Sequence, residues 1–152
     1  MTRDPMQGVT ILLADDDEED RAMTISALRK RRVANEIRCV GDGAELADYL
    51  FHRGRYADPD DAPTPGLILL DLNMPKKDGR EVLAEIKADD TLRSIPVVVL
   101  TTSKAEEDVA RTYHLGVNSF ITKPVTFTAL VEVMQTWSRY WFEIVDLPNG
   151  GQ

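Results

Sequence analysis

The sequence is short of several residue types, and each shortage excludes a class of protein. Cys39 is the single cysteine in 152 residues, which excludes an internal disulfide framework and a cysteine-based zinc site and fits a reducing compartment. We interpret it as a small buried hydrophobe. No apolar run approaches the roughly 20 residues of a membrane-spanning helix, and the stretch from Met1 to Met6 lacks the apolar core of a signal peptide. We therefore expect a cytoplasmic protein that does not associate with membranes.

Basic residues are also few relative to acidic ones. Against 26 Asp and Glu there are 18 Lys and Arg, a formal charge of −8. This excess of carboxylates repels nucleic-acid phosphate and anionic membrane surfaces, so we expect no nucleic-acid partner. Divalent cations are the more natural small partner.

The composition is that of an ordinary globular domain. Hydrophobic residues make up 43% of the chain and charged residues 29%, which excludes a disordered or fibrous protein. The length favours one domain. We expect it to span residues 9–146, with short tails at 1–8 and 147–152.

Strand and helix patterns alternate five times along the chain. Short apolar runs predict strands over Val9–Leu13, Glu36–Val40, Leu67–Leu70, Pro96–Leu100 and Ser119–Ile121. Helical spacing predicts helices over Glu18–Arg32, Ala44–Arg53, a stretch containing Val82, Leu83 and Ile86, Ala105–His114 and Phe127–Phe142. The segment from Gly54 to Gly66, which is rich in Pro and Asp, is expected to be a surface loop.

This alternation favours an α/β fold, a doubly wound parallel sheet with right-handed crossovers and helices on both faces. In such a sheet, ligands bind outside the carboxyl ends of the strands. The fold class thus indicates where functional side chains should lie before any motif is considered.

Polar residues follow four of the five predicted strands. Asp15 and Asp16 follow the first, Asp71 ends the third, Thr101 follows the fourth and Lys123 follows the fifth. Three crowded carboxylates must either take up protons or bind a cation. With no His or Cys nearby, hard oxygen ligands favour Mg²⁺, and a lysine with a hydroxyl can bind an anion that the metal recruits. The pattern therefore predicts a phosphoryl site.

Each of these residues alone has an ordinary explanation. An Asp after a strand is usually a cap or turn residue, a lone Thr usually caps the next helix, and a lone Lys is usually a solvated surface charge. The conjunction in this order is difficult to explain by caps alone, which favours the functional interpretation. The third acid, Asp17, is interpreted as the cap of the first helix and not as a metal ligand.

Four motifs resemble those of bacterial response regulator receiver domains. They are Ile11-Leu12-Leu13-Ala14-Asp15-Asp16, Leu70-Asp71-Leu72-Asn73-Met74-Pro75, Val99-Leu100-Thr101 and Thr122-Lys123-Pro124. The resemblance extends over about residues 9–142. It implies a flavodoxin-like five-stranded sheet of order 2-1-3-4-5, and a signalling phosphoacceptor rather than an enzyme with its own substrate.

The resemblance also implies a metal site and a phosphoacceptor. Asp71 would accept the phosphoryl group. Mg²⁺, or Mn²⁺, would be bound directly by Asp16, through water by Asp15, and by the Asp71 carboxylate and the Asn73 backbone carbonyl.

The remaining site residues are expected to sense the phosphoryl group. By the resemblance Lys123 would pair with it, the Thr101 hydroxyl would turn towards it, and Phe120 would be the switch aromatic. The Lys123-Pro124 bond is expected to be cis. Thr102 departs from the alanine that many members carry, and we expect its bulk to alter the access of water and hence the phosphoryl lifetime.

The implied partner is a sensor histidine kinase. The tail Trp-Phe-Glu-Ile-Val and the extended segment before the third strand are similar to single-domain regulators paired with phytochrome-type kinases, including bacteriophytochromes. Aromatic residues concentrate near Trp137 and Trp141, which fits either packing against the domain's own sheet or a protein interface. We favour the interface and expect a homodimer through the fourth helix, fifth strand and fifth helix and the C-terminal helix. Since the sequence ends at Gln152, output by contact or by competition for phosphoryl groups is expected.

Three alternatives belong to other functional classes. An aspartyl-phosphate hydrolase would need a second acid two residues after its nucleophile, where Asn73 stands. A flavin-binding module would need phosphate donors after the first strand, where Asp15 and Asp16 repel phosphate. A phosphorylation-independent interaction module remains a distant alternative, because every expected site residue is present.

Overall fold

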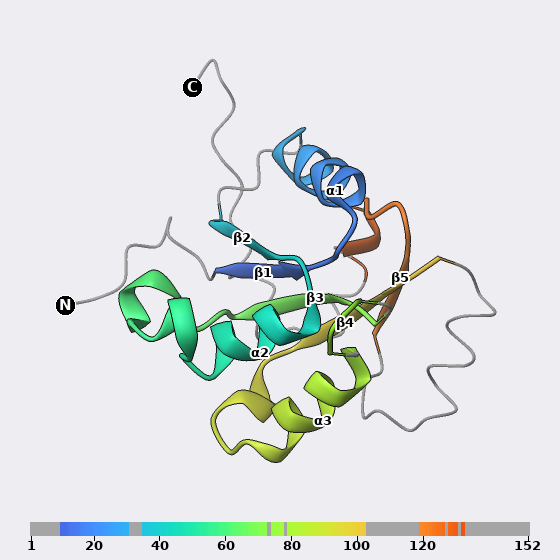
Figure 1. Cartoon of the computed structure of the whole chain (residues 1–152). Coiled ribbons are helices and arrows are strands. Elements are labelled where there is room, and N and C mark those ends of the chain that lie inside the picture. The colour runs from blue at the N-terminus through green and yellow to red at the C-terminus, as the bar shows by residue number, and fades with distance from the viewer. Residues whose placement is uncertain are drawn as a thin grey trace.

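The protein is described from a computed structural model that places residues 10–30, 35–72, 74–77, 79–102, 119–126, 128–130 and 132. These residues form a five-stranded sheet with strand order β2-β1-β3-β4-β5 (Figure 1). The strands are β1 (Ile11–Ala14), β2 (Ile37–Val40), β3 (Leu67–Asp71), β4 (Val97–Thr101) and β5 (Phe120–Thr122). All four neighbouring pairs are parallel, so the predicted fold class and strand order are confirmed.

Helices cover both faces of this sheet. Helix α1 (Glu18–Lys30) lies on one face, and α2 (Gly43–Leu50) and α3 (Gly79–Ala88) lie on the other (Figure 1). The first turn of α1 contains three acidic residues and its last turn two basic residues. These charges complement the helix dipole at both ends. The Asp42 side chain caps α2 by accepting the N–H of Glu45 at 2.7 Å.

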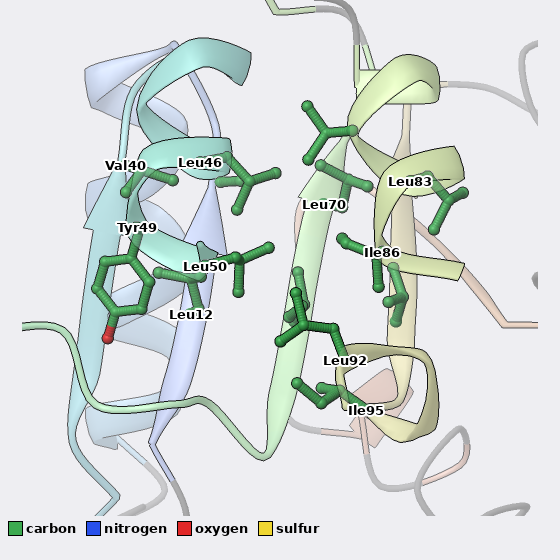
Figure 2. Close-up of a cluster of buried hydrophobic side chains, with 14 of the residues drawn as sticks. Leu12, Val40, Leu46, Tyr49, Leu50, Leu70, Leu83, Ile86, Leu92 and Ile95 are labelled. Atoms are coloured by element: carbon green, nitrogen blue, oxygen red, sulfur yellow. The ribbon is translucent and has the colours of Figure 1, made fainter. Parts of the chain in front are cut away.

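Two hydrophobic clusters lie on opposite sides of the sheet. Because side chains alternate across a strand, Leu12 and Leu70 belong to the cluster beneath α2 and α3, whereas Leu13 and Leu69 belong to the cluster beneath α1. Figure 2 shows the first cluster, in which side chains from α2 and α3 meet those of the strands. All residues of β1, β3 and β4 are buried, as expected for central strands covered on both faces.

The segment between α2 and β3 is more ordered than the surface loop that the sequence predicts. It contains two 3-10 helices, Gly54–Tyr56 and Pro59–Asp61, and it buries Tyr56 and Ala62. The Tyr49 hydroxyl donates to the carbonyl of Pro63 at 2.8 Å. This segment therefore extends the core next to the edge strand β2.

Most element boundaries differ from the predicted ones by one to three residues. The first strand is Ile11–Ala14 rather than Val9–Leu13, and the fourth strand includes Thr101 at its end. Strand ends are set by pairing with neighbours, as in the register Ala14↔Val40, and a single-strand pattern does not contain this information.

Several predictions concern residues that lie outside the described part of the chain. These are the helix over Ala105–His114, most of the helix over Phe127–Phe142, the Asn73 carbonyl, and the tails at 1–8 and 147–152. Of the last predicted helix, residues 128–130 and 132 are described and are helical. Within the described part of the chain, no helix combines the length and the apolar character needed to cross a membrane.

Candidate functional site

The predicted site residues meet at one edge of the sheet. Asp15 follows β1, Asp71 and Thr101 are the last residues of β3 and β4, and Lys123 follows β5. The register Asp71↔Leu100 and Thr101↔Thr122 aligns these strand ends. An open pocket of about 620 Å³ lies there, lined by Asp16, Asp17, Glu18, Glu19, Asp20, Asp71, Thr102 and Lys123.

Three carboxylates form a compact cluster at this edge of the sheet. Asp15, Asp16 and Asp71 each offer an oxygen, and these oxygens lie within 4.8 Å of one another. Asp15 is fully buried and Asp71 nearly so, whereas Asp16 is exposed. Such a group repels itself electrostatically unless a cation offsets the charge.

Lys123 supplies one such cation. Its Nζ donates to Asp71 Oδ2 at 2.9 Å and to Asp20 Oδ2 at 3.0 Å. It also lies 2.9 Å from Asp15 Oδ2, although that oxygen makes no hydrogen bond of good geometry, so the contact with Asp15 is an ion pair. The peptide bond between Lys123 and Pro124 is cis, as the resemblance predicts.

Asp15 is fixed by hydrogen bonds to residues close to it in sequence. Its Oδ1 accepts the N–H of Asp17 at 3.0 Å, and its carbonyl accepts a hydrogen bond from Arg21 at 2.5 Å. These contacts leave Oδ2 facing Lys123 and the carboxylate cluster, buried and without a hydrogen bond. A buried anionic oxygen in this state is a suitable ligand for a hard divalent cation.

The pKa shifts have identifiable causes. Burial raises the pKa of Asp15 above its ordinary value, and this exceeds the opposing effects of Lys123 and the Asp17 N–H. Burial acts to lower the pKa of Lys123, but its contacts with Asp15, Asp71 and Asp20 outweigh burial and raise it. Lys123 therefore stays protonated while the ionised form of Asp15 is destabilised.

Thr101 and Phe120, the two residues predicted to form a switch, lie at the end of β4 and the start of β5. Thr101 is fully buried, and among the described residues its Oγ1 has no hydrogen-bond partner. Phe120 begins β5, is partly buried, and lies against the cluster beneath α2 and α3. The neighbouring Thr102 is exposed and lines the pocket.

The sequence explains Asp17 and Asp20 as residues that stabilise the start of a helix, without a role in the site. Asp17 caps α1, since its Oδ1 accepts the N–H of Asp20 at 3.0 Å, which confirms the predicted cap. The contact of Asp20 with Lys123 was not predicted, because an acid in the first turn of a helix is already explained by the helix dipole. The contact joins the first turn of α1 to the residue that follows β5, so only the tertiary structure creates it.

A doubly wound sheet with an acidic pocket at its carboxyl edge is the arrangement that the sequence analysis expected of a receiver domain. The comparison with known families identifies the same class. The family model described as the response regulator receiver domain matches residues 11–135. The chain therefore belongs to this family, the receiver domains of two-component signalling.

The similar proteins include response regulators named for phytochrome or bacteriophytochrome signalling. Response regulator Rcp1 of Synechocystis sp. is 44% identical over 138 residues, covering 91% of this chain and 92% of that protein. The structure of the bacteriophytochrome response regulator AtBRR has a TM-score of 0.82 and 42% identity, covering 94% of this chain and 99% of the other. The phosphorylated cyanobacterial phytochrome response regulator RcpA has a TM-score of 0.68 and 46% identity, with 88% and 94% covered.

Proposed function

We propose that this chain accepts a phosphoryl group on Asp71 from a sensor histidine kinase, with Mg²⁺ or Mn²⁺ as cofactor. The observation that carries the proposal is the 2.9 Å hydrogen bond from Lys123 to Asp71, made beside two further carboxylates within 4.8 Å. A fixed cation next to a carboxylate nucleophile offsets the repulsion of an incoming phosphate. The chain acts as a signalling phosphoacceptor and has no small-molecule substrate of its own.

Three described residues would bind the metal: Asp15, Asp16 and Asp71. The buried, unbonded Oδ2 of Asp15 supports this assignment, and the resemblance adds the carbonyl of Asn73. When bound, the ion supplies Lewis-acid stabilisation of phosphoryl oxygens. The related protein Rcp1 has been solved in a Mn²⁺-bound form, with 43% identity and a TM-score of 0.68 over 92% of this chain and 99% of the other.

Asp71 would attack the phosphorus of a kinase phosphohistidine. One bond forms between an Asp71 carboxylate oxygen and phosphorus, the phosphorus–nitrogen bond breaks, and the imidazole leaves with its electron pair and takes up a proton from solvent. Lys123 stabilises charge on the transferring oxygens. Most of the rate enhancement therefore comes from positioning and electrostatics.

The phosphoryl group would then act on Thr101. Its hydroxyl is buried with no partner among the described residues, so a phosphoryl oxygen would satisfy it. Inward movement of the Thr101 side chain would leave space for Phe120 to rotate. This rotation would shift a conformational equilibrium at the output face, which includes β5.

The decisive experiment is phosphorylation by acetyl phosphate and Mg²⁺, followed by intact mass. We expect wild type to gain one phosphoryl group and Asp71→Asn to gain none. Asp60→Asn, an exposed acid outside the pocket, is the matched control and should react as wild type does. Equal phosphorylation of Asp71→Asn would refute the assignment.

The partner proposed here is a phytochrome-type histidine kinase, acting in the cytoplasm where ATP supplies its phosphoryl group. The support is the similarity to AtBRR and RcpA. Phosphotransfer profiling against the purified sensor kinases of the host should give the fastest transfer from a phytochrome kinase. A faster donor of another sensor class would refute this partner.

The output would be a homodimer through the face that includes β5 and the C-terminal helix, and not binding to nucleic acid. The net charge of −8 and the aromatic residues near Trp137 support this. Gel filtration with light scattering, with and without acetyl phosphate, tests it. A monomer in both conditions would end the dimer proposal.

A further inference from the structure

Asp20 lies in the pocket but has no role in the mechanism described so far. It belongs to the first turn of α1, and its Oδ2 lies 3.0 Å from Lys123 Nζ although 103 residues separate the two in sequence. The Asp20 side chain is 37% exposed, whereas that of Lys123 is 13% exposed. The ammonium group therefore has few alternative partners in water.

The contacts of Lys123 are divided among three carboxylates. An ammonium group has three N–H donors. Two donate to Asp71 and Asp20, and the third side faces Asp15 in an ion pair. These are the carboxylate contacts of Lys123 within the described part of the chain.

Asp20 differs from the other two partners in its relation to the metal cluster. The oxygens of Asp15 and Asp71 belong to the group that could share a cation, together with Asp16, and Asp20 does not. If a cation and a phosphoryl group were bound at Asp15 and Asp71, Asp20 would still be able to accept the hydrogen bond from Lys123.

The backbone of Asp20 is fixed independently of Lys123. Asp17 accepts its N–H at 3.0 Å as the helix cap, and the adjacent Arg21 donates to the carbonyl of Asp15. The start of α1 is therefore tied to the end of β1. A carboxylate on this rigid turn can hold a long, flexible lysine side chain in one position.

We propose that Asp20 is a positioning residue that anchors the Lys123 ammonium over the acceptor oxygen of Asp71 during phosphoryl transfer. This inference rests on the proposed function, because it assigns a role within the same reaction. Asp20 would act through Lys123, without contact with the phosphoryl group or the metal. Its effect would lie in the rate of transfer and not in metal affinity.

The test compares three variants at saturating Mg²⁺ with acetyl phosphate as donor. In Asp20→Ala the phosphorylation rate should fall about fivefold, the size expected for one partly exposed hydrogen bond to a charged group. In Asp20→Asn, whose amide oxygen still accepts, the loss should be smaller. Glu19→Gln removes the same charge from the same pocket without touching Lys123, and its rate should stay within about twofold of wild type.

A double-mutant cycle with Lys123→Met separates positioning from a structural effect. If Asp20 acts through the lysine, Asp20→Ala should cause no further loss of rate in the Lys123→Met background. The Mg²⁺ affinity of Asp20→Ala, measured by fluorescence or calorimetry, should match that of Glu19→Gln. Thermal unfolding verifies that Asp20→Ala and Glu19→Gln are folded. If Asp20→Ala does not fold, Asp20→Asn is used in its place.

The outcomes distinguish this inference from the proposed function. Wild type that is not phosphorylated would overturn both. Wild type that is phosphorylated, with Asp20→Ala as fast as Glu19→Gln, would overturn the role of Asp20 alone. A fivefold loss that persists in the Lys123→Met background would also overturn it, since Asp20 would then act by another route.

Discussion

The Nζ atom of Lys123 lies 2.9 Å from both Asp71 Oδ2 and Asp15 Oδ2, so one ammonium group joins the ends of three strands. Lys123→Met should therefore destabilise the metal-free protein by about 3 kcal/mol, because it leaves buried carboxylates without their cation. The same change should increase Mg²⁺ affinity, since a competing positive charge is removed. Urea unfolding with and without Mg²⁺ measures both effects.

Lys87→Met is the control for the lysine experiment. Lys87 is partly buried, and burial lowers its pKa, but it belongs to α3 and not to the pocket. Its removal should leave the Mg²⁺ dependence of unfolding unchanged. A Lys123→Met protein with wild-type stability and wild-type Mg²⁺ affinity would contradict the role given to this contact.

Thr101 carries a buried hydroxyl that has no partner among the described residues. Thr101→Val has nearly the same shape and removes this polar atom, so it should stabilise the unphosphorylated protein by about 1 kcal/mol. Chemical denaturation tests this, with Thr101→Ser as the comparison that keeps the hydroxyl and loses a methyl group. A valine variant less stable than wild type would show that the hydroxyl has a favourable contact.

Gly43 lies against the loop that follows β3. A Cβ atom at Gly43 would be 1.7 Å from the carbonyl oxygen of Lys77, so Gly43→Ala must displace that backbone. We expect a loss of about 2 kcal/mol or more in the free energy of unfolding, and weaker Mg²⁺ binding because this loop adjoins Asp71.

Gly41→Ala is the matched control, measured by the same urea unfolding. A Cβ at Gly41 would meet its nearest neighbour, Arg21, at 3.6 Å, which is an ordinary contact. This variant should differ from wild type by less than about 0.5 kcal/mol. Equal losses in both variants would mean that the Gly43 contact is not the cause.

The protein should lose stability at alkaline pH because of the Tyr56 hydroxyl, which lies in the segment before β3. Burial, together with its 2.6 Å hydrogen bond to Glu45, raises the pKa of Tyr56 to about 12. A pKa raised above its unfolded value contributes stability that is complete below about pH 10 and is lost as the pH rises towards 12. Wild type should therefore lose stability over this range more steeply than Tyr56→Phe. Parallel curves for the two proteins would contradict this.

Much of the fold could be predicted from periodicity alone. Short apolar runs such as Leu67 to Leu70 identified buried parallel strands, and the alternation with helices indicated the doubly wound sheet. The 3-10 helices within residues 54–66 could not be predicted, because they depend on contacts such as that of Tyr49 with Pro63. Turn-forming residues indicate a loop whether or not it packs on the core.

The site could be predicted because its residues are tied to strand ends. Asp15, Asp71, Thr101 and Lys123 were all placed at one edge of the sheet by topology, and the structure confirms this position. Their roles in phosphoryl transfer remain proposals. Asp20 was missed, because a contact across 103 residues has no local signal.

The sequence by itself determined the alternation of strands and helices and the set of acids and the lysine at the strand ends, since periodicity and strand ends are local properties. The strand order came from the family resemblance of the motifs. Only the tertiary structure decided which carboxylates share Lys123, that Thr101 has a buried hydroxyl without a partner in the described residues, and that Asp15 has a raised pKa. The physical reason is that burial and charge pairing depend on distances between strands that are remote in sequence.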